Sequence, residues 1–472
     1  MDRKDIFCEI VKCECDKKFI NIKRIIMNSK EVEKDDLFIA IRGGNKFTGE
    51  ALEKGAYVVY DDKDIQIEEK FKEKAFYVND SVEFLQEFAE KWRKNLNLKV
   101  IGITGSNGKT TVKDMIYHLL SVKYKGKKTE GNYNNHIGLP FTLLRAEKGD
   151  DFIILEMGMS GFGEIDLLGK ISSPDISVIT NIGESHLEFL KTKKNVFKAK
   201  TEIIPHTKET LVINGDDEYL KDIDENSLKE KGLKTVKILN MGNDKKHMEN
   251  IKKSVKSNND FYYGDIDFNE VETKFTLEYF DENCKKWTHK FYNTNVLGEH
   301  NILNLTIAVS VAKEMALGDE EIEKAVKDIV LTNMRFQIIT KGKTTYINDA
   351  YNASPMSMKK SLETFSKIYN DREKIAVIGD MLELGEQEGE LHASIFDVII
   401  NTNLNRLYLY GPRMRFLYDR IRENSNSENI KKIETEYFES KEQIKEKLEG
   451  IKEEKVVLIK ASRGMKLEEV ME

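Results

Sequence analysis

Short apolar runs and amphipathic segments alternate along most of this chain. The segment 81–96 places Val82, Leu85, Phe88 and Trp92 at helical spacing and predicts a helix. Strand-like apolar runs lie at 37–41, 56–60, 99–104, 152–156, 176–180 and 210–214. Because strands that alternate with helices build parallel sheets, the pattern predicts a doubly wound α/β fold.

The rhythm changes twice toward the C-terminus. Residues 260–293 show short alternating runs that predict an antiparallel patch, and 301–317 predicts a following helix. From residue 332 the α/β rhythm returns, with strands expected at 344–349, 374–380, 407–411 and 455–460. At roughly 150 residues per domain, a chain of 472 residues favours about three domains. We expect them at 1–97, 98–331 and 332–472.

Composition and charge narrow the classes of function. The 75 basic and 82 acidic residues leave a net charge of −7, which argues against a nucleic-acid coat or a binder of anionic membranes. No apolar run approaches the roughly 18–20 residues of a membrane span, and the charged N-terminus does not resemble a signal peptide. We therefore expect a cytoplasmic protein. Four cysteines lack zinc-finger spacing and are expected to be reduced thiols: Cys8, Cys13, Cys15 and Cys284.

The strongest local signal for chemistry is the stretch ITGSNGKTTVKDM at 103–115. A strand ends, a loop with Gly105 and Gly108 follows, and a helix begins at Lys109. Free backbone N–H groups at a helix N-terminus bind phosphate, the lysine reaches the β- and γ-phosphates, and Thr110 offers a hydroxyl to magnesium. A full Walker A motif has glycine where this chain has Ile103. The alternative is a chance Gly-Lys-Thr turn.

Three further residues are weaker candidates. Glu156 ends a buried apolar run, where a carboxylate holds the metal of a bound nucleotide or simply caps the strand. His186 follows another strand and is either a metal ligand or a structural histidine. Lys200 reads as an ordinary lysine on a helix surface, and the residue pattern alone does not single it out.

Nine motifs together resemble the Mur ligase family and follow that family's order. They are TGSNGKTT, GNYNNHIGLP, EMGMSGFGEI, TNIGESHLE, AKTEI, GEHNILN, NDAYNASPMSM, GDMLELGE and KASRGMKLEEV. The family uses a shortened GxxGKTT loop, which accounts for Ile103. The NDAYNASPMSM and GDMLELGE signatures favour the branch of the family that adds D-alanyl-D-alanine.

This resemblance implies a fold and a reaction. The fold would comprise a small N-terminal α/β domain for the UDP end of the substrate, a central P-loop ATPase-like domain and a C-terminal Rossmann-like domain. The reaction would join D-alanyl-D-alanine to UDP-N-acetylmuramoyl-tripeptide through an acyl phosphate, in cytoplasmic peptidoglycan precursor synthesis. ATP and two Mg²⁺ ions would be needed, and the partners would be small molecules rather than nucleic acid. We expect a monomer.

The resemblance also implies roles for individual residues. Lys109 would contact the transferring phosphate, while Thr110 and Glu156 would hold one magnesium ion. His186 and Lys200 would serve the second ion, with Lys200 carbamoylated. Nucleotide-binding residues would be Gly105, Ser106, Asn107, Gly108, Lys109, Thr110 and Thr111, with Asn301 at adenine, Asp349 at ribose and Arg335 at phosphate. Lys109, His186, Lys200 and Arg335 would be catalytic. Substrate-binding candidates are Ser29, Asn45, Asn134, Asn135, Asn352, Ser354, Lys460 and Arg463.

The N-terminal section departs from the family pattern. Asn28-Ser29-Lys30 replaces the usual Asp-Ser-Arg, and GGNKF at 43–47 replaces Asp-Gly-His-Asp-Phe, so Asn45 stands at the histidine. Three alternatives remain: a Mur ligase that adds another amino acid, a folylpolyglutamate-synthase-like ligase, and a nucleotide-binding protein that no longer catalyses. The absence of an Asp-Asn-Pro-Arg stretch disfavours the diaminopimelate-adding relative. The full set of candidate catalytic residues disfavours a non-catalytic protein.

Overall fold

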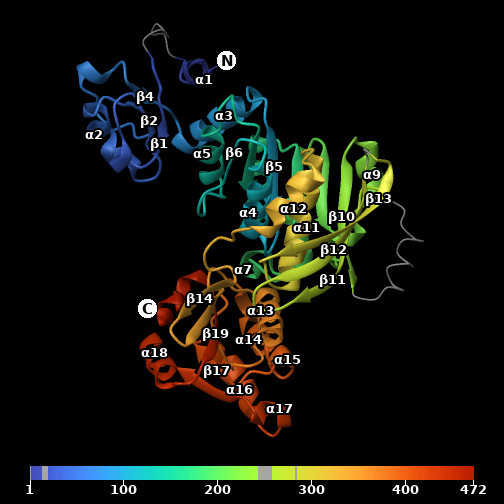
Figure 1. Ribbon diagram of the computed structural model, residues 1–472. Helices are drawn as coiled ribbons and strands as arrows, with labels where there is room; N and C mark the ends of the chain where they lie inside the picture. The colour runs from blue at the N-terminus through green and yellow to red at the C-terminus, as the bar shows by residue number, and fades with distance from the viewer. Residues whose placement is uncertain (1, 13–19, 243–257, 282–283) are drawn as a thin grey trace. The chain divides into compact units, whose positions relative to one another are not determined.

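The structure is a computed structural model that describes residues 2–12, 20–242, 258–281 and 284–472 (Figure 1). Its chain forms two compact units, each assembled from several segments. The first unit comprises Met1–Thr104, Tyr124–Ser177 and Glu202–Glu209; the second comprises Gly105–Lys123, Val178–Thr201 and Thr210–Glu472. The three-domain boundaries expected from the sequence stay a prediction.

The first unit begins with a small parallel sheet in the order β1-β2-β3-β4. Apolar side chains of these strands, including Phe38 and Val58, form its core against helix α2. Helix α3 begins after Asp80, whose carboxylate accepts hydrogen bonds from the backbone N–H groups of Val82 and Glu83 and so caps the helix. The bounds are α1 Arg3–Ile10, β1 Ile25–Ile26, β2 Leu37–Ile39, α2 Thr48–Glu53, β3 Tyr57–Tyr60, β4 Ala75–Tyr77 and α3 Ser81–Lys94.

The same unit contains a second set of parallel strands, ordered β5-β7-β6. Strands β5 and β7 are almost completely buried, as expected for parallel strands covered on both faces. Helix α3 packs against α5 and α6. The bounds are β5 Lys99–Thr104, β6 Gly126–Lys128, α5 Gly138–Leu144, β7 Phe152–Glu156 and α6 Glu164–Ser172.

The second unit contains strands in the order β8-β9-β10-β11-β12-β13, of which β8 spans the boundary between the units. Strands β9, β10 and β11 are parallel, whereas β11, β12 and β13 pair antiparallel, which confirms the expected patch. Helix α11 packs against β9, β10, β11 and helix α4 (Figure 1). The bounds are α4 Lys109–Leu120, β8 Ile176–Ile179, α7 Leu187–Leu190, α8 Lys193–Thr201, β9 Thr210–Asn214, α9 Glu225–Glu230, β10 Lys234–Gly242, β11 Phe261–Phe268, β12 Thr273–Asp281, β13 Lys286–Thr294, α11 Glu299–Glu314 and α12 Asp319–Lys327.

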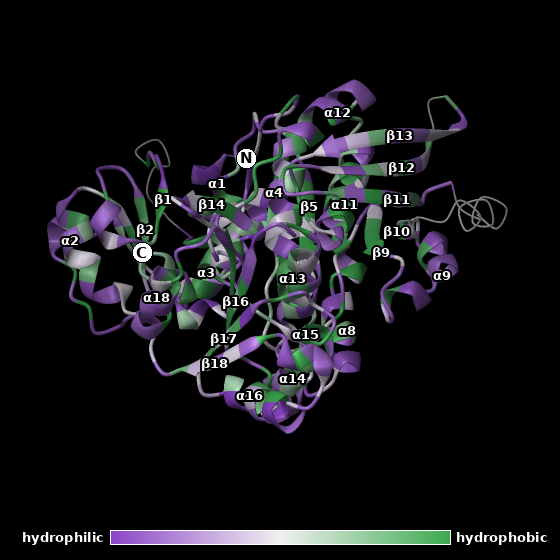
Figure 2. Cartoon of the chain, turned by 60° about the horizontal axis from the view of Figure 1, so that its bottom comes forward, coloured by the Kyte–Doolittle hydropathy of each residue, from purple (hydrophilic) through white to green (hydrophobic). Residues whose placement is uncertain are grey.

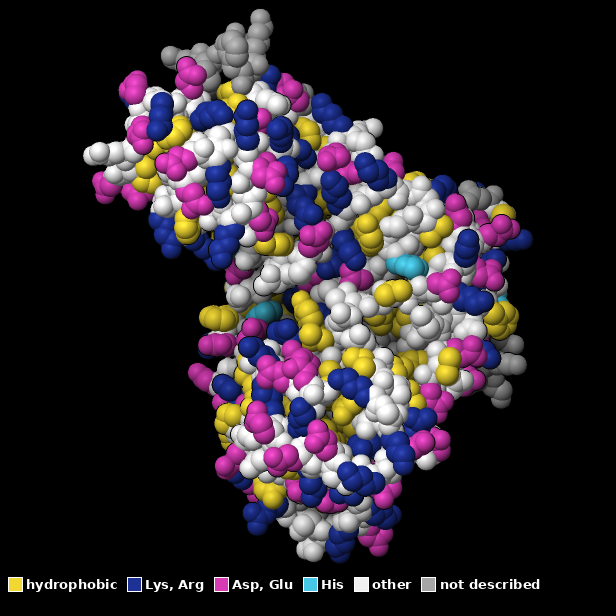
Figure 3. Space-filling model, turned by 60° about the vertical axis from the view of Figure 1, so that its left-hand side comes forward, with side chains coloured by type: hydrophobic (Ala, Val, Ile, Leu, Met, Phe, Trp, Pro, Cys, Tyr) yellow, Lys and Arg dark blue, Asp and Glu magenta, His cyan; other side chains and the backbone are white. Residues whose placement is uncertain are grey.

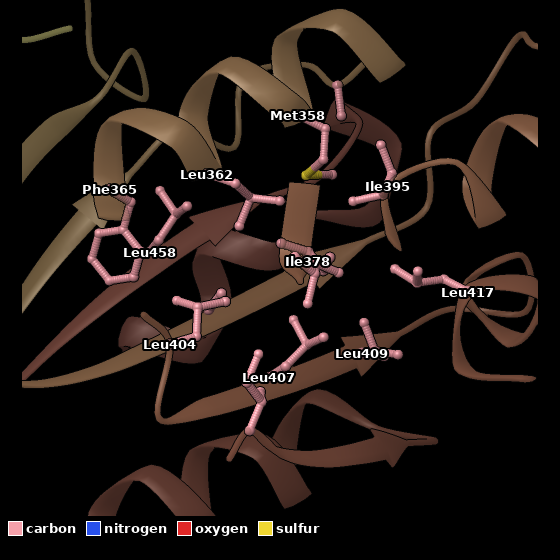
Figure 4. Packing of buried hydrophobic residues seen from close by; sticks show 14 of the residues in the cluster. Met358, Leu362, Phe365, Ile378, Ile395, Leu404, Leu407, Leu409, Leu417 and Leu458 are labelled. Atoms are coloured by element: carbon pink, nitrogen blue, oxygen red, sulfur yellow. The ribbon is translucent and has the colours of Figure 1, made fainter. Parts of the chain in front are cut away.

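A six-stranded sheet follows in the same unit, ordered β14-β15-β19-β16-β17-β18. All its pairs are parallel except β14-β15, an antiparallel hairpin that the sequence pattern did not predict. Figure 4 shows Met358, Leu362 and Phe365 of α13 packed over Ile378 and Leu458 of the sheet. The bounds are β14 Gln337–Lys341, β15 Thr344–Asn348, α13 Pro355–Lys367, β16 Glu373–Gly379, α14 Glu388–Ala393, α15 Phe396–Ile399, β17 Arg406–Tyr410, α16 Met414–Glu423, α17 Glu428–Lys431, β18 Glu434–Phe438, α18 Lys441–Gly450 and β19 Lys455–Lys460.

Hydropathy follows this layering. Apolar residues concentrate on the strands, while the outer faces of helices such as α9 and α12 are polar (Figure 2). On the face shown in Figure 3, basic and acidic side chains are interspersed, in keeping with the small net charge. Within the described ranges, no helix is both long and apolar enough to cross a membrane. Among the described residues, Cys8 is buried and Cys284 is exposed, and neither forms a disulfide; Cys13 and Cys15 lie outside the described residues.

Candidate functional site

The loop between β5 and α4 takes a conformation that requires its glycines. Gly105 has φ +148° and Gly108 has φ +83°, values that residues with a side chain adopt only under strain. A Cβ on Gly105 would lie 1.9 Å from Oγ1 of Thr180, and a Cβ on Gly108 would lie 2.7 Å from Oδ1 of Asn304. The backbone can approach its neighbours this closely only because both side chains are absent.

The end of β8 holds the loop in place. Asn107 donates its backbone N–H to Oδ1 of Asn181 at 2.9 Å, and its carbonyl accepts from Oγ1 of Thr180 at 2.5 Å. Ser106 donates its backbone N–H to the carbonyl of Asn181 at 2.9 Å. The residue pattern pointed to the loop itself but not to Thr180 and Asn181, which fix its shape.

Helix α4 begins in this loop with the features of an anion site. Gly108 is its N-cap and supplies no side-chain cap, so the first-turn N–H groups keep their capacity to bind a phosphate. Lys109 folds back over the loop and donates Nζ to the carbonyl of Gly105 at 2.7 Å. Thr110 and Thr111, in the first turn, are buried. The structure therefore brings all the predicted loop residues into one cradle.

Glu156 ends β7 as a buried carboxylate, as predicted. Its Oε1 accepts a hydrogen bond from Nδ2 of Asn134 at 3.2 Å, and its backbone N–H donates to Oγ1 of Thr129. Asn135 uses its side chain differently, because Oδ1 accepts from the backbone N–H groups of Ile137 and Gly138. Asn134 thus contacts the candidate metal ligand, whereas Asn135 shapes the loop before α5.

His186 lies in the loop before α7 and has a left-handed backbone with φ 55°. Its Nδ1 lies 3.0 Å from Oε2 of Glu383, a residue of the loop after β16. The hydrogen bond from His186 lowers the pKa of Glu383, and the positive charge of Lys109 lowers it further. The sequence analysis did not single out Glu383, although it lies within the GDMLELGE motif.

Lys200 is not a surface lysine. It lies on α8 with a relative exposure of 1%, so the interpretation as an ordinary helix-surface residue is wrong. Burial lowers its pKa well below the ordinary value, and the charge of Lys109 adds to this effect. Within the described part of the chain, Nζ of Lys200 has no hydrogen-bond acceptor. These surroundings favour a neutral, nucleophilic amine.

Asp349 is the centre of a polar cluster after β15. Lys460 donates Nζ to Oδ2 of Asp349 at 2.7 Å and to the carbonyl of Asn352 at 3.2 Å. Ser361 donates its hydroxyl to the same Oδ2 at 2.5 Å. The guanidinium of Arg335 lies 4.1 Å from the ring centre of Tyr351. The structure therefore brings Asp349, Asn352 and Lys460 together, while their roles toward a nucleotide or another substrate stay a prediction.

Two predicted residues serve helices α11 and α13. Asn301 is buried, donates Nδ2 to the carbonyl of Leu297 and accepts from Asn304. Ser354 is the N-cap of α13, where Oγ accepts the backbone N–H of Ser357 at 3.3 Å. The same hydroxyl lies 2.9 Å from Oδ1 of Asn107 and 3.2 Å from Oγ of Ser357, and it can donate to either. The phosphate loop and the start of α13 are thus in direct contact.

The remaining predicted residues have local partners. Ser29 lies in a 3-10 turn, and its carbonyl accepts from Nζ of Lys54 at 3.2 Å. Asn45 donates Nδ2 to Oδ1 of Asp61 at 2.6 Å. Arg463 pairs with Glu468. These contacts do not assign a ligand to Ser29, Asn45 or Arg463.

The donor set fits a hard cation that arrives with a nucleotide. Within the described ranges, no three His, Cys, Asp or Glu residues cluster closely enough to form a complete metal cage. Magnesium is usually bound by one or two carboxylates together with substrate phosphates and water, so such a cage is not required. In the second unit the hydroxyl of Thr110 and the imidazole of His186 suit this mode of binding, and in the first unit so does the carboxylate of Glu156.

Comparisons with known proteins give a consistent result. Residues 103–312 match the Mur ligase middle domain, and residues 334–463 match the Mur ligase, glutamate ligase domain. The chain is 33% identical over 457 residues to the UDP-N-acetylmuramoyl-tripeptide–D-alanyl-D-alanine ligase of Bacillus subtilis strain 168, covering 95% of this chain and 92% of that protein.

Solved structures are similar over nearly the whole chain. The MurF ligase of Thermotoga maritima in complex with ADP is 29% identical, with a TM-score of 0.78 over 96% of this chain and 97% of that one. A crystal structure of MurF from Acinetobacter baumannii has a TM-score of 0.81 at 24% identity, over 99% and 97% of the two chains. This second likeness concerns the fold alone.

Proposed function

This chain belongs to the Mur ligase family, and from that premise we propose that it joins D-alanyl-D-alanine to UDP-N-acetylmuramoyl-tripeptide at the expense of ATP. Family membership confirms the resemblance inferred from the nine motifs. The two substrates are those for which the Bacillus subtilis relative is named, and that protein is similar over most of both chains. A nucleotide is supported by the ADP complex of the Thermotoga maritima protein.

The proposed reaction makes an amide from an unreactive carboxylate. An oxygen of the tripeptide carboxylate attacks the γ-phosphorus of ATP, giving an acyl phosphate and ADP. The amine of D-alanyl-D-alanine then attacks the acyl carbon, inorganic phosphate leaves with the C–O bond electrons, and the nitrogen loses a proton. Phosphoryl transfer depends mainly on positioning and charge neutralisation.

The observation that carries the proposal is the cradle around Lys109. Two glycines, at 105 and 108, allow the backbone to close around a phosphate. Hydrogen bonds with Thr180 and Asn181 fix the loop backbone in this conformation. In the proposed reaction, the Lys109 ammonium leaves the carbonyl of Gly105 and neutralises charge on the transferring phosphoryl group. A preorganised cation of this kind stabilises the transition state more than the ground state.

We extend the proposal to the metals and to Lys200. Thr110 and Glu156 would hold one Mg²⁺, and His186 and Lys200 would hold another; bound magnesium supplies charge neutralisation for the phosphates. A buried neutral amine adds to CO₂ with loss of a proton, which turns Lys200 into a carbamate. That product would give α8 an anionic oxygen pair where an ammonium would repel a metal ion.

Other assignments belong to the same proposal. Asn301, Arg335 and Asp349 would contact the nucleotide, while Ser29, Asn45, Asn134, Asn135, Asn352, Ser354, Lys460 and Arg463 are candidates for contacts with the other substrates. The cluster around Asp349 supports the nucleotide assignment, because a partly buried carboxylate oriented by Lys460 can also accept hydrogen bonds from ribose hydroxyls. We further propose a cytoplasmic monomer.

Phosphate release by the purified chain tests the function. UDP-N-acetylmuramoyl-tripeptide, ATP, Mg²⁺ and D-alanyl-D-alanine together should give phosphate and a UDP-linked pentapeptide, detectable by mass spectrometry. Single L-amino acids, diaminopimelate with a UDP-dipeptide, and glutamate with a folate should not. A product from diaminopimelate would move the chain to a neighbouring Mur ligase, and a folate product would indicate a folylpolyglutamate-synthase-like activity.

A second experiment tests the carbamate. Protein equilibrated with ¹³C-labelled bicarbonate should show a carbamate carbon signal by NMR, and the signal should be missing in Lys200→Ala. A spectrum without that signal in the wild-type protein would contradict the modification while leaving the ligase proposal open.

A further inference from the structure

The contact between His186 and Glu383 is made by two loops that adopt costly backbone conformations. His186 has φ 55° and Glu383 has φ 67°, and side-chain-bearing residues rarely occupy this left-handed region. Such conformations persist where the surrounding structure imposes them, and they concentrate at functional sites. Both residues of this side-chain contact share this feature.

The backbones of the two loops are also fitted to each other. Glu188 donates its N–H toward the carbonyl of Glu383 at 3.4 Å. Gly385 has φ +64°, and a Cβ at this position would lie 2.8 Å from Cα of Glu188. Because the loops meet through their main chains, the pair is held by more than two flexible side chains.

The carboxylate determines which imidazole nitrogen carries the proton. An ionised carboxylate only accepts hydrogen bonds, so Nδ1 of His186, 3.0 Å from Oε2 of Glu383, must be the donor. Nε2 then holds the lone pair of a neutral ring. Among the described residues, Nε2 of His186 has no hydrogen-bonding partner. This is the arrangement in which a carboxylate orients a metal-binding histidine.

We propose that Glu383 is a positioning residue for the second magnesium ion, holding His186 so that Nε2 is its ligating nitrogen. The inference rests on the proposed function, because that function supplies the ion. It adds a carboxylate from the loop after β16 to a metal site otherwise built from residues between β8 and the end of α8. Glu383 does not ligate the metal or touch the reacting atoms.

Manganese binding tests this role without turnover. Bound Mn²⁺ is measured by electron paramagnetic resonance on the full chain with bicarbonate, a non-hydrolysable ATP analogue and UDP-N-acetylmuramoyl-tripeptide. Removing a carboxylate that orients a metal-binding histidine usually costs about 10–100-fold in metal affinity. Glu383→Ala should weaken the second Mn²⁺ by about this factor and leave the first Mn²⁺ and the nucleotide unaffected.

Four further variants sharpen the result. Glu383→Gln keeps an acceptor oxygen but not the charge, so its loss should be smaller, and it carries the test if the alanine variant melts early. His186→Ala should weaken binding of the second Mn²⁺. Adding Glu383→Ala to that variant should reduce the affinity little further, because Glu383 acts only through His186. Glu386→Gln makes the same charge change three residues away and should bind both ions normally.

The proposal is overturned if Glu383→Ala binds both ions within twofold of wild type, or if the wild-type chain binds only one. It is also overturned if Glu383→Ala instead tightens nucleotide binding without metal, since Glu383 would then be a competitor for Lys109. A wild-type chain that binds two ions but never ligates D-alanyl-D-alanine would contradict the proposed function and leave this metal-binding result intact.

Discussion

Two lysines in different parts of the second unit are equally buried and otherwise unlike. Lys200 on α8 and Lys374 at the start of β16 each have a relative exposure of 1%. Lys374 donates Nζ to the carbonyl of Ser366 at 2.8 Å and to the side-chain oxygens of Asn370 and Asn403 at 2.8 and 3.0 Å. Lys200 has no such acceptors among the described residues.

This difference separates a structural ammonium from a reactive amine. Three acceptors replace the water that Lys374 loses on folding, and the group holds together the end of α13 and two loops. Lys200 is desolvated without that compensation, which is destabilising unless the amine is neutral or modified. Burial alone therefore does not mark a functional lysine, and the proposal for Lys200 rests on its burial together with the absence, among the described residues, of acceptors like those of Lys374.

Removing Lys200 should give the largest effect on activity. Lys200→Ala would lose the proposed carbamate, and we expect ligation to fall on the order of 10²–10³-fold, as when one preorganised charge-stabilising group is lost. High acetate should partly restore activity, because a small carboxylate can occupy the vacated space and ligate magnesium. The measurement is phosphate release as a function of acetate concentration.

Lys109→Ala is the matched control for that experiment. It should lose activity on a similar scale of about 10²–10³-fold, but acetate should not restore it, because its defect is a missing cation. Full activity of Lys200→Ala without acetate would show that Lys200, like Lys374, has no role in the reaction. Acetate rescue of both variants would show that the rescue is unspecific.

The pH dependence of stability should distinguish Lys374 next. Burial lowers its pKa from 10.5 to about 8, so between these values the unfolded chain binds more protons than the folded one. Stability conferred through this residue should therefore rise as the pH increases from 8 to 10.5.

Thermal melting of wild type and Lys374→Met across this pH range isolates the effect, since other titrating groups are common to both. The melting temperature of the wild type relative to that of Lys374→Met should increase as the pH rises. Parallel curves would indicate that the three acceptors keep the ammonium charged throughout.

The smallest expected effect concerns stability at neutral pH. Lys374→Met leaves three acceptors to find other partners, and because Asn370 and Asn403 are exposed we expect a loss of about 1–2 kcal/mol. Lys200→Met removes an amine without acceptors and should leave the melting temperature unchanged or raised. A larger loss of stability for Lys200→Met than for Lys374→Met would contradict the view that Lys374 is the structural lysine of the two.

The comparison also shows what the sequence could predict. The phosphate loop was predictable because its determinants are consecutive: an apolar strand at 99–104, glycines that permit a tight approach, and a lysine at the helix start. Strands at 152–156 and 210–214 were predicted for the same local reason. The burial of Lys200 was not predicted, because the residue pattern around it does not separate a covered position of α8 from an exposed one.

Three other features were not predicted from the sequence, for related reasons. The hairpin β14-β15 departs from the parallel rhythm by one edge strand, and its sequence is too short and polar to reveal its direction. Glu383 lay within a recognised motif, but its partner His186 is almost two hundred residues away in sequence. Asn45 was expected at a substrate, and the contact the structure shows for it is with Asp61.

The hydroxyl of Ser354 has one hydrogen and two oxygens within reach, Oδ1 of Asn107 and Oγ of Ser357. A hydroxyl donates to one acceptor at a time, so its proton can turn from the loop to the helix cap without leaving a donor unsatisfied. If the contact with Asn107 is lost, the Ser354 hydroxyl can still donate its hydrogen to Oγ of Ser357. The hydroxyl of Ser354 therefore stays hydrogen-bonded whichever of the two oxygens accepts its proton.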